Sequence, residues 1–81
     1  MQIYKITNLI TGKIYIGKDE ANRPEYYGSG KLIRRSLEKY GKVNHTKEVI
    51  EEVSERILLV EREKYWIKQY NATDRTIGYN I

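Results

Sequence analysis

The chain has 81 residues, a formal net charge of +4 and an isoelectric point near 9.3, and its length predicts a single domain over residues 1–81. The absence of cysteine and the presence of only one histidine, His45, exclude a disulfide framework, a thiolate metal site and any site that needs two histidines. There is neither a signal-peptide pattern nor an apolar run long enough to cross a bilayer, so we expect a soluble, cytoplasmic protein with no membrane partner.

The first predicted element is a β-hairpin. Residues 2–17 contain two runs of β-branched and aromatic residues separated by a short loop, which is typical of paired strands. If Thr7 faces Gly12 across the turn, antiparallel pairing places Tyr4 opposite Tyr15 on the same face of the sheet. Tyrosine is almost the only aromatic residue used, with eight tyrosines and no phenylalanine. The tyrosine pair therefore either belongs to a polar site or only supports the hairpin.

A helix of about three turns follows an irregular segment. Pro24 disfavours a helix at the residue before it, and a flexible glycine-rich turn comes next. We expect Ser29 to cap the start of the helix and Gly41 to end it. The apolar stripe of this helix comprises Leu32, Ile33, Leu37 and Tyr40.

The same region is the most basic part of the sequence. Residues 30–42 carry five basic residues and one acidic residue. Because the apolar stripe faces the core, Lys31, Arg34 and Arg35 are expected to face away from it. This charge balance is compatible with a polyanionic partner, but it equally describes a solvated helix face.

The second half of the chain predicts a third strand and a longer helix. Residues 47–53 are predicted to form the strand, with Val49 and Ile50 buried. A turn over residues 71–76 and an extended segment, residues 77–81, close the chain.

The longer helix, predicted over residues 54–70, carries one acidic residue on its apolar side. Ser54 is the expected N-cap, and Glu55 lies in the first turn, where the helix dipole favours a negative charge. Glu63 falls between Ile67 and Tyr70 on a helical wheel, about 160° from the exposed side. The exposed stripe comprises Glu61, Lys64 and Lys68.

An ionised carboxylate on an apolar face needs an explanation. Its burial costs several kcal/mol unless it is paired, hydrogen-bonded or bound to a cation. Glu63 can lie at the rim of the helix and reach water, pair with an arginine, or hold a divalent metal, which prefers oxygen ligands. The helix considered alone ranks these three explanations in that order.

Three segments in the observed order, IYKITNLITGKIYIG, EREKYWI and GYNI, resemble the GIY-YIG nuclease family, which includes phage and intron homing endonucleases. The resemblance covers essentially the whole chain. The segment YYGSG before a helix that ends in EKYG is similar to the phage homing-endonuclease branch. The resemblance implies an α+β fold, a small three-stranded antiparallel sheet flanked by helices.

The resemblance also implies a function and a set of site residues. It implies a DNA endonuclease that hydrolyses phosphodiester bonds of double-stranded DNA with one Mg²⁺ or Mn²⁺ and no small-molecule cofactor. Tyr4 would be the base or the positioner of the attacking water, and Tyr15 the second tyrosine of the motif. Gly17 would keep the backbone clear of the phosphate. Glu63 would be the single metal ligand, and Asn80 would help to order the site.

The sequence departs from the family pattern at the arginine. The first motif lacks its leading glycine, and the arginine that usually follows the YIG triplet has no obvious counterpart. Arg35, Arg34 and Arg23 are the candidates for contacting the phosphate. A free phenol has a pKa near 10 and is a poor base at neutral pH. A neighbouring cation, with Lys18 or Lys13 as candidates, would be needed to lower that pKa.

Two other function classes compete with the nuclease. A catalytically inactive domain of the same fold would bind nucleic acid without cutting it. A purely structural domain would use the tyrosines and Glu63 to satisfy one another. The complete set of Tyr4, Tyr15, Glu63 and Asn80 favours the nuclease. His45 falls in a predicted loop and receives no role.

Overall fold

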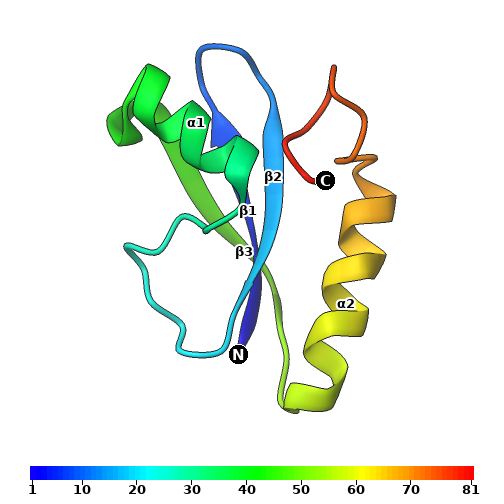
Figure 1. Ribbon diagram of the computed structural model, residues 1–81. Helices are drawn as coiled ribbons and strands as arrows, with labels where there is room; N and C mark the ends of the chain where they lie inside the picture. Colours follow the sequence, from blue (N-terminus) through cyan, green and yellow to red (C-terminus); the bar gives the residue numbers. More distant parts are fainter.

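A computed structural model describes all 81 residues. The strands form one antiparallel sheet in the order β2-β1-β3, so β1 is the central strand (Figure 1). This arrangement, with two helices, confirms the expected α+β fold. None of the helices combines the length and the apolar character needed to cross a membrane. The elements in chain order are β1 (Gln2–Asn8), β2 (Ile14–Asp19), α1 (Lys31–Tyr40), a 3-10 turn η1 (Lys42–Asn44), β3 (His45–Glu52) and α2 (Arg56–Gln69).

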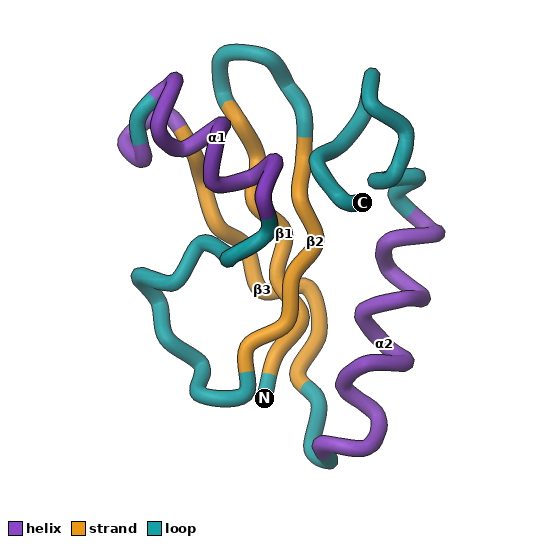
Figure 2. Tube along the Cα trace, viewed as in Figure 1, coloured by secondary structure: helices purple, strands orange, loops and turns teal.

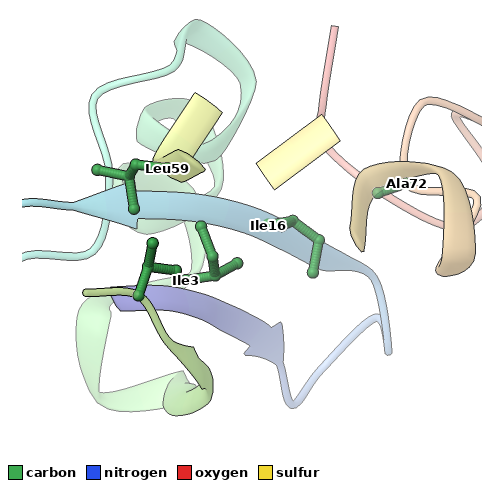
Figure 3. Packing of buried hydrophobic residues seen from close by; sticks show 5 residues of the cluster. Ile3, Ile16, Leu59 and Ala72 are labelled. Atoms are coloured by element: carbon green, nitrogen blue, oxygen red, sulfur yellow. The ribbon is translucent and has the colours of Figure 1, made fainter. Parts of the chain in front are cut away.

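The sheet separates two layers with different cores. Helix α2 covers one face, and α1 with the loop before it covers the other (Figure 2). Because successive strand residues point to opposite faces, Ile3 packs toward α2, whereas Tyr4 packs toward α1. The α2-side core consists of five buried residues (Figure 3): Ile3, Ile16, Val53, Leu59 and Ala72. The α1-side core consists of Tyr4, Ile6 and Ile33.

The hairpin forms, but its predicted register is wrong. Thr7 pairs with Ile14 rather than with Gly12, so Gly17, not Tyr15, lies opposite Tyr4. The cause is the side chain of Asn8, whose Oδ1 accepts hydrogen bonds from the two amides of residues 10–11 at 2.8 and 3.2 Å and holds a longer loop. A shift of two residues preserves the face of each side chain.

Both helices begin one or two residues later than predicted. The N-cap of α1 is Gly30, because the hydroxyl of Ser29 instead accepts a hydrogen bond from the Tyr26 hydroxyl at 3.1 Å. The N-cap of α2 is Glu55 rather than Ser54, and no side chain caps it. The amide of the preceding Val53 still donates to the carbonyl of Met1 at 2.8 Å, which keeps the chain extended up to that point.

The third strand contains a bulge that the sequence pattern did not reveal. Ile3 pairs with Glu51 and Tyr4 pairs with Val49, so Ile50 is an extra residue in the ladder. The bulge allows both Ile50 and Glu51 to face α2. Ile50 packs against the α2-side core as predicted, but the predicted burial of Val49 is wrong, since it lies on an outer strand with 44% of its surface exposed.

Candidate active site

Two tyrosines from neighbouring strands lie together on the α1 side of the sheet. The rings of Tyr4 and Tyr15 have centroids 6.4 Å apart. They are diagonal neighbours in the observed register, a distance that aromatic side chains can span. Tyr26, from the loop before α1, packs edge-on against Tyr4 with centroids 6.2 Å apart. Tyr4 is 1% exposed, whereas Tyr15 is only partly buried.

Two glycines make room for these rings. A Cβ added at Gly17 would overlap the end of the Tyr4 ring. The Tyr4 ring therefore lies over Gly17, the position for which the family resemblance implies a clear path to the phosphate. A Cβ at Gly28 would lie 2.7 Å from the Tyr15 ring, and its φ of +105° would also be strained for another residue. The two glycines thus fix where both rings can sit.

Glu63 approaches from the opposite face, at the β2 edge of the sheet. Its side chain is 19% exposed, and its nearest charge partner is Lys18 on β2, with Nζ 3.9 Å from Oε1. Burial raises the pKa of Glu63, and the Lys18 ammonium only partly offsets this. The two tyrosines lie on the other face of the sheet, and β2 is an edge strand. The negative charge of Glu63 nevertheless contributes to raising the pKa of Tyr15 and of Tyr4.

The arginine pairing considered for Glu63 does not occur. The guanidinium next to it in sequence, Arg62, donates from Nε to Glu51 at 2.8 Å. The indole N–H of Trp66 donates to the same carboxylate at 2.7 Å. The hydrogen bond from Trp66 is the main reason that the pKa of Glu51 is lowered, and Arg62 adds to it against the effect of burial. The carboxylate of Glu51, on β3, is therefore satisfied by side chains of α2. The carboxylate of Glu63, on α2 itself, has only the more distant Lys18 as a charged partner.

Both phenols are held in the neutral form. Burial raises the pKa of Tyr15 to about 12, with Glu63 and Tyr26 adding to the effect and the backbone of Gly30 opposing it. Burial raises the pKa of Tyr4 further, and its tyrosine neighbours contribute next. With their pKa values raised in this way, neither group is a phenolate at neutral pH, and a neutral phenol is a poor proton acceptor.

The cation that packs over the Tyr4 ring is Lys47, which no sequence pattern singles out. Its Nζ lies 4.5 Å from the centre of the Tyr4 ring and donates hydrogen bonds to the carbonyls of Arg23 and Tyr26, at 2.7 and 2.8 Å. The other two candidate lysines lie elsewhere: Lys18 pairs with Glu63 on α2, and the ammonium of Lys13 lies over the Tyr79 ring. Lys47 thus holds the loop against the first tyrosine.

The three arginine candidates have different surroundings. Arg23 binds the buried carboxylate of Asp19, with Nη2 3.1 Å from Oδ1, and its guanidinium lies 4.1 Å from the centre of the Tyr26 ring. Arg34 and Arg35 are exposed, as predicted for this face of α1, and neither forms an ion pair. These two line an open hollow of about 270 Å³ together with Ser29, Lys31 and Glu38.

Asn80 connects the last segment of the chain to β2. Its Oδ1 accepts a hydrogen bond from the amide of Ile16, and its Nδ2 donates to the carbonyl of the same residue, both at 2.8 Å. This paired contact is buried and lies between the two strand residues of interest, Tyr15 and Gly17. Asn80 is therefore placed to position β2, without contacting the phenols itself.

His45 is the first residue of β3 rather than part of a loop, and it is buried. Its Nδ1 lies 2.7 Å from the carbonyl of Gly41, and its Nε2 lies 2.7 Å from the hydroxyl of Ser36. Since a carbonyl only accepts, Nδ1 carries the proton and Nε2 accepts from the serine. Asn8 donates to the same hydroxyl at 3.0 Å. This network joins α1 to the sheet.

The donor set for a metal is small. No group of three or more histidine, cysteine or acidic side chains is arranged to hold a metal ion. Glu63 is a partly buried carboxylate whose charged partner, Lys18 on β2, is 3.9 Å away. A single carboxylate suits Mg²⁺, which keeps several waters and takes other ligands from substrate phosphates.

Comparisons with known proteins find named endonucleases among the proteins similar to this chain. No family model matches the chain. A protein of Enterobacteria phage T4 named as an endonuclease, segB, is 44% identical over 80 residues, which cover 96% of this chain and 36% of that protein. The intron-associated endonuclease 1 of the same phage is 34% identical over 90 residues, which cover 98% of this chain and 36% of that protein. The chain thus spans about a third of the length of these relatives.

A solved structure is similar over nearly its whole length. The catalytic domain of the homing endonuclease I-TevI superposes with a TM-score of 0.73 at 33% sequence identity. The match covers 99% of this chain and 96% of that one. The shared fold therefore comes with sequence similarity along the whole domain.

Proposed function

The chain belongs to the GIY-YIG nuclease family, and we propose that it is the catalytic module of a homing-endonuclease-like enzyme that hydrolyses phosphodiester bonds in double-stranded DNA with a divalent metal. The observation that carries the proposal is the position of Glu63. It is a partly buried carboxylate without an arginine partner, it lies next to Lys18 on β2, the strand that carries Tyr15, and its charge raises the pKa of Tyr15 and, less strongly, of Tyr4.

Glu63 is the proposed metal ligand, for Mg²⁺ or Mn²⁺. The raised pKa of this carboxylate reflects a negative charge that lacks compensation. Lys18 is too distant to supply a strong hydrogen bond. A bound divalent cation would supply polarisation of a phosphate oxygen and stabilisation of the leaving alkoxide.

Tyr15 and Tyr4 are proposed to position the attacking water and the phosphate. A neutral phenol both donates and accepts hydrogen bonds, so it can orient a water without removing its proton. Tyr15 is the more accessible of the two and is the better placed to touch substrate. Gly17 leaves room for the Tyr4 ring, and Asn80 fixes the strand that carries Tyr15.

Phosphate neutralisation is proposed for Arg34 and Arg35. Their guanidinium groups are exposed and unpaired at the start of α1. The hydroxyl of Tyr15 lies beside Gly30 at the same end of the helix. Arg23, by contrast, has Nε and Nη2 engaged by Asp19, which leaves it a role in holding the loop.

Plasmid nicking with and without Mg²⁺ or Mn²⁺ tests the proposal, using Glu63→Gln and, as a matched control, Glu61→Gln on the exposed stripe of the same helix. Loss of the metal ligand removes several kcal/mol of transition-state stabilisation, so nicking should fall by roughly 10³-fold. The control should cut like the parent. A Glu63→Gln variant that cuts normally would contradict the metal-site assignment.

Metal binding can be measured without cleavage. Mg²⁺ that binds only the folded chain should raise the melting temperature of the parent. The same titration should leave Glu63→Gln unchanged, while Glu61→Gln should follow the parent. An equal shift in all three proteins would assign metal binding to another place.

A further inference from the structure

A second hollow lies farther along α1, away from the proposed catalytic groups. It has a volume of about 210 Å³ and lies between the helix and the β1–β2 loop. Three of its lining residues are basic: Lys13, Arg35 and Lys39. No acidic side chain lines it, and none of these three cations forms an ion pair. The hollow therefore presents uncompensated positive charge.

The cations are held in place by their neighbours. The Lys13 ammonium lies 5.9 Å from the centre of the Tyr79 ring, and the Lys39 ammonium lies 5.3 Å from the centre of the Tyr40 ring. Both tyrosines line the hollow. Arg35 and Lys39 are four residues apart, so they project from the same face of α1. The charges thus converge on one space instead of spreading over the surface.

Neutral hydrogen-bond donors complete the lining. Asn8 donates to the hydroxyl oxygen of Tyr79 at 3.1 Å, which leaves the tyrosine proton available for another acceptor. The hydroxyl of Thr11 lies 3.4 Å from the Tyr79 hydroxyl, and either oxygen can donate in this pair. Two hydroxyl groups and three cations form a set of donors that suits the oxygens of a phosphodiester.

We infer that this hollow, lined by Lys13, Arg35 and Lys39, is a second phosphate site that holds a DNA backbone phosphate flanking the one that is cut. The inference rests on the proposed function for the identity of the ligand. Arg35 lines both hollows, so it connects the second site to the hollow beside Tyr15.

The spacing along α1 agrees with a tract of DNA backbone. Lys31 and Lys39 are eight residues apart, which corresponds to about 12 Å along a helix. One DNA strand carries a phosphate about every 3.4 Å of helix axis. The basic face of α1 is therefore longer than the axial rise between successive phosphates, so the backbone can continue from one hollow into the next.

The test is the salt dependence of duplex binding, measured by fluorescence anisotropy in the Glu63→Gln background so that cleavage does not interfere. Each phosphate contact contributes about 0.9 to the slope of log K against log salt. Because both lysines contact the same phosphate, Lys13→Ala/Lys39→Ala should reduce the slope by up to roughly 0.9. Lys64→Ala/Lys68→Ala removes the same charge from the exposed stripe of α2, on the other side of the sheet, and should leave the slope nearly unchanged.

Equal slopes for the two double variants would overturn the inference, because the loss would then reflect net charge alone. Absence of salt-dependent binding by the Glu63→Gln parent would overturn it as well. Plasmid nicking reports separately on the proposed function: a chain that binds through this hollow but does not cut would preserve the second site and refute the nuclease. Circular dichroism and melting curves establish that both double variants are folded.

Discussion

The two faces of the sheet are covered by different kinds of side chain. The face under α2 is an aliphatic core in which Ile3, Ile16 and Leu59 are almost completely buried. The face under α1 packs tyrosine rings around Tyr4 and contains a buried polar network centred on the hydroxyl of Ser36. The first face is held by contacts that need no precise orientation, whereas the second depends on directed hydrogen bonds and ring geometry.

Charge is distributed between the same two faces. On the α2 side, Arg62 is paired with Glu51, and Arg56 with Glu20. On the α1 side, the exposed basic residues of the helix have no acidic partners. Lys64 and Lys68 on α2 are also without ion pairs, so the α1 face is distinguished by the two hollows that its cations line. On the α2 side, Glu63 has only the distant Lys18 as a charged partner.

Asn80 holds the edge strand from the α2 side, and its replacement is expected to have the largest effect on stability. In Asn80→Ala, two buried backbone groups of Ile16 lose their partners. Each costs roughly 1–3 kcal/mol, so the free energy of unfolding should fall by about 3 kcal/mol in denaturant titrations. Ile81→Ala, at the exposed next residue, is the control and should change it by less than about 0.5 kcal/mol. A loss below about 1 kcal/mol would show that water replaces the amide.

Gly17→Ala tests ring packing on the α1 side. The new methyl group would overlap the buried Tyr4 ring, and overpacking of this kind costs about 2 kcal/mol. Replacing the ring, as in Tyr4→Leu, should remove most of the cost of Gly17→Ala, which a double-mutant cycle would detect as coupling. Gly12→Ala meets no neighbour, so it should cost only backbone strain and show no coupling to Tyr4. Additive costs for residues 4 and 17 would contradict the packing explanation.

The hairpin register and the contact of Asn80 show how far the fold and the site can be predicted from the sequence. Periodicity alone indicates the strands, the helices and the unusual position of Glu63, because each depends on which face a residue occupies. The hairpin register could not be predicted, since it depends on two hydrogen bonds that loop amides donate to the Asn8 side chain. The partner of Asn80 was equally hidden, because Ile16 lies 64 residues away and the contact is to its backbone.

Lys47 was missed for a related reason. A lysine in a strand with several charged neighbours looks like part of a solvated edge. Its actual partners are two carbonyls in the irregular loop, and no pattern predicts which carbonyls a loop presents. The sequence alone could not separate the three arginine candidates for the phosphate contact. Arg23 is set apart only by its ion pair with Asp19, which the structure reveals.

Lys47→Met should have a smaller effect, confined to the α1 side. Methionine retains much of the apolar stem but loses both hydrogen bonds to the loop. We expect a loss of about 1 kcal/mol in stability and faster proteolysis within residues 20–30. Lys64→Met, at an exposed position of α2, should change neither quantity. Unchanged proteolysis in Lys47→Met would show that the loop is held by other contacts.

The smallest expected effect is the pH dependence contributed by Glu63. Its pKa in the folded chain is raised above the ordinary value of 4.5, so the ionised carboxylate destabilises the fold at neutral pH. The cost disappears as the pH falls through the folded pKa and below the unfolded one. Glu63→Gln should therefore be more stable than the parent at pH 7 without metal, and the difference should vanish in acid.

Asp19, on the other face, should behave with the opposite sign. Burial raises its pKa, but its hydrogen bonds with Arg23 and the amide of Ala21 outweigh this and leave the pKa below the ordinary value of 3.8. Its stabilisation is present above that value and is lost as the pH falls through the folded pKa. Asp19→Asn should therefore be less stable than the parent at pH 7, with the difference closing in acid. Denaturant titrations from pH 3 to 8 measure the stability of each variant relative to the parent. If Glu63→Gln were destabilised at pH 7 as Asp19→Asn is, the charge of Glu63 would be compensated within the fold. The reason for placing a cation beside Glu63 would then be lost.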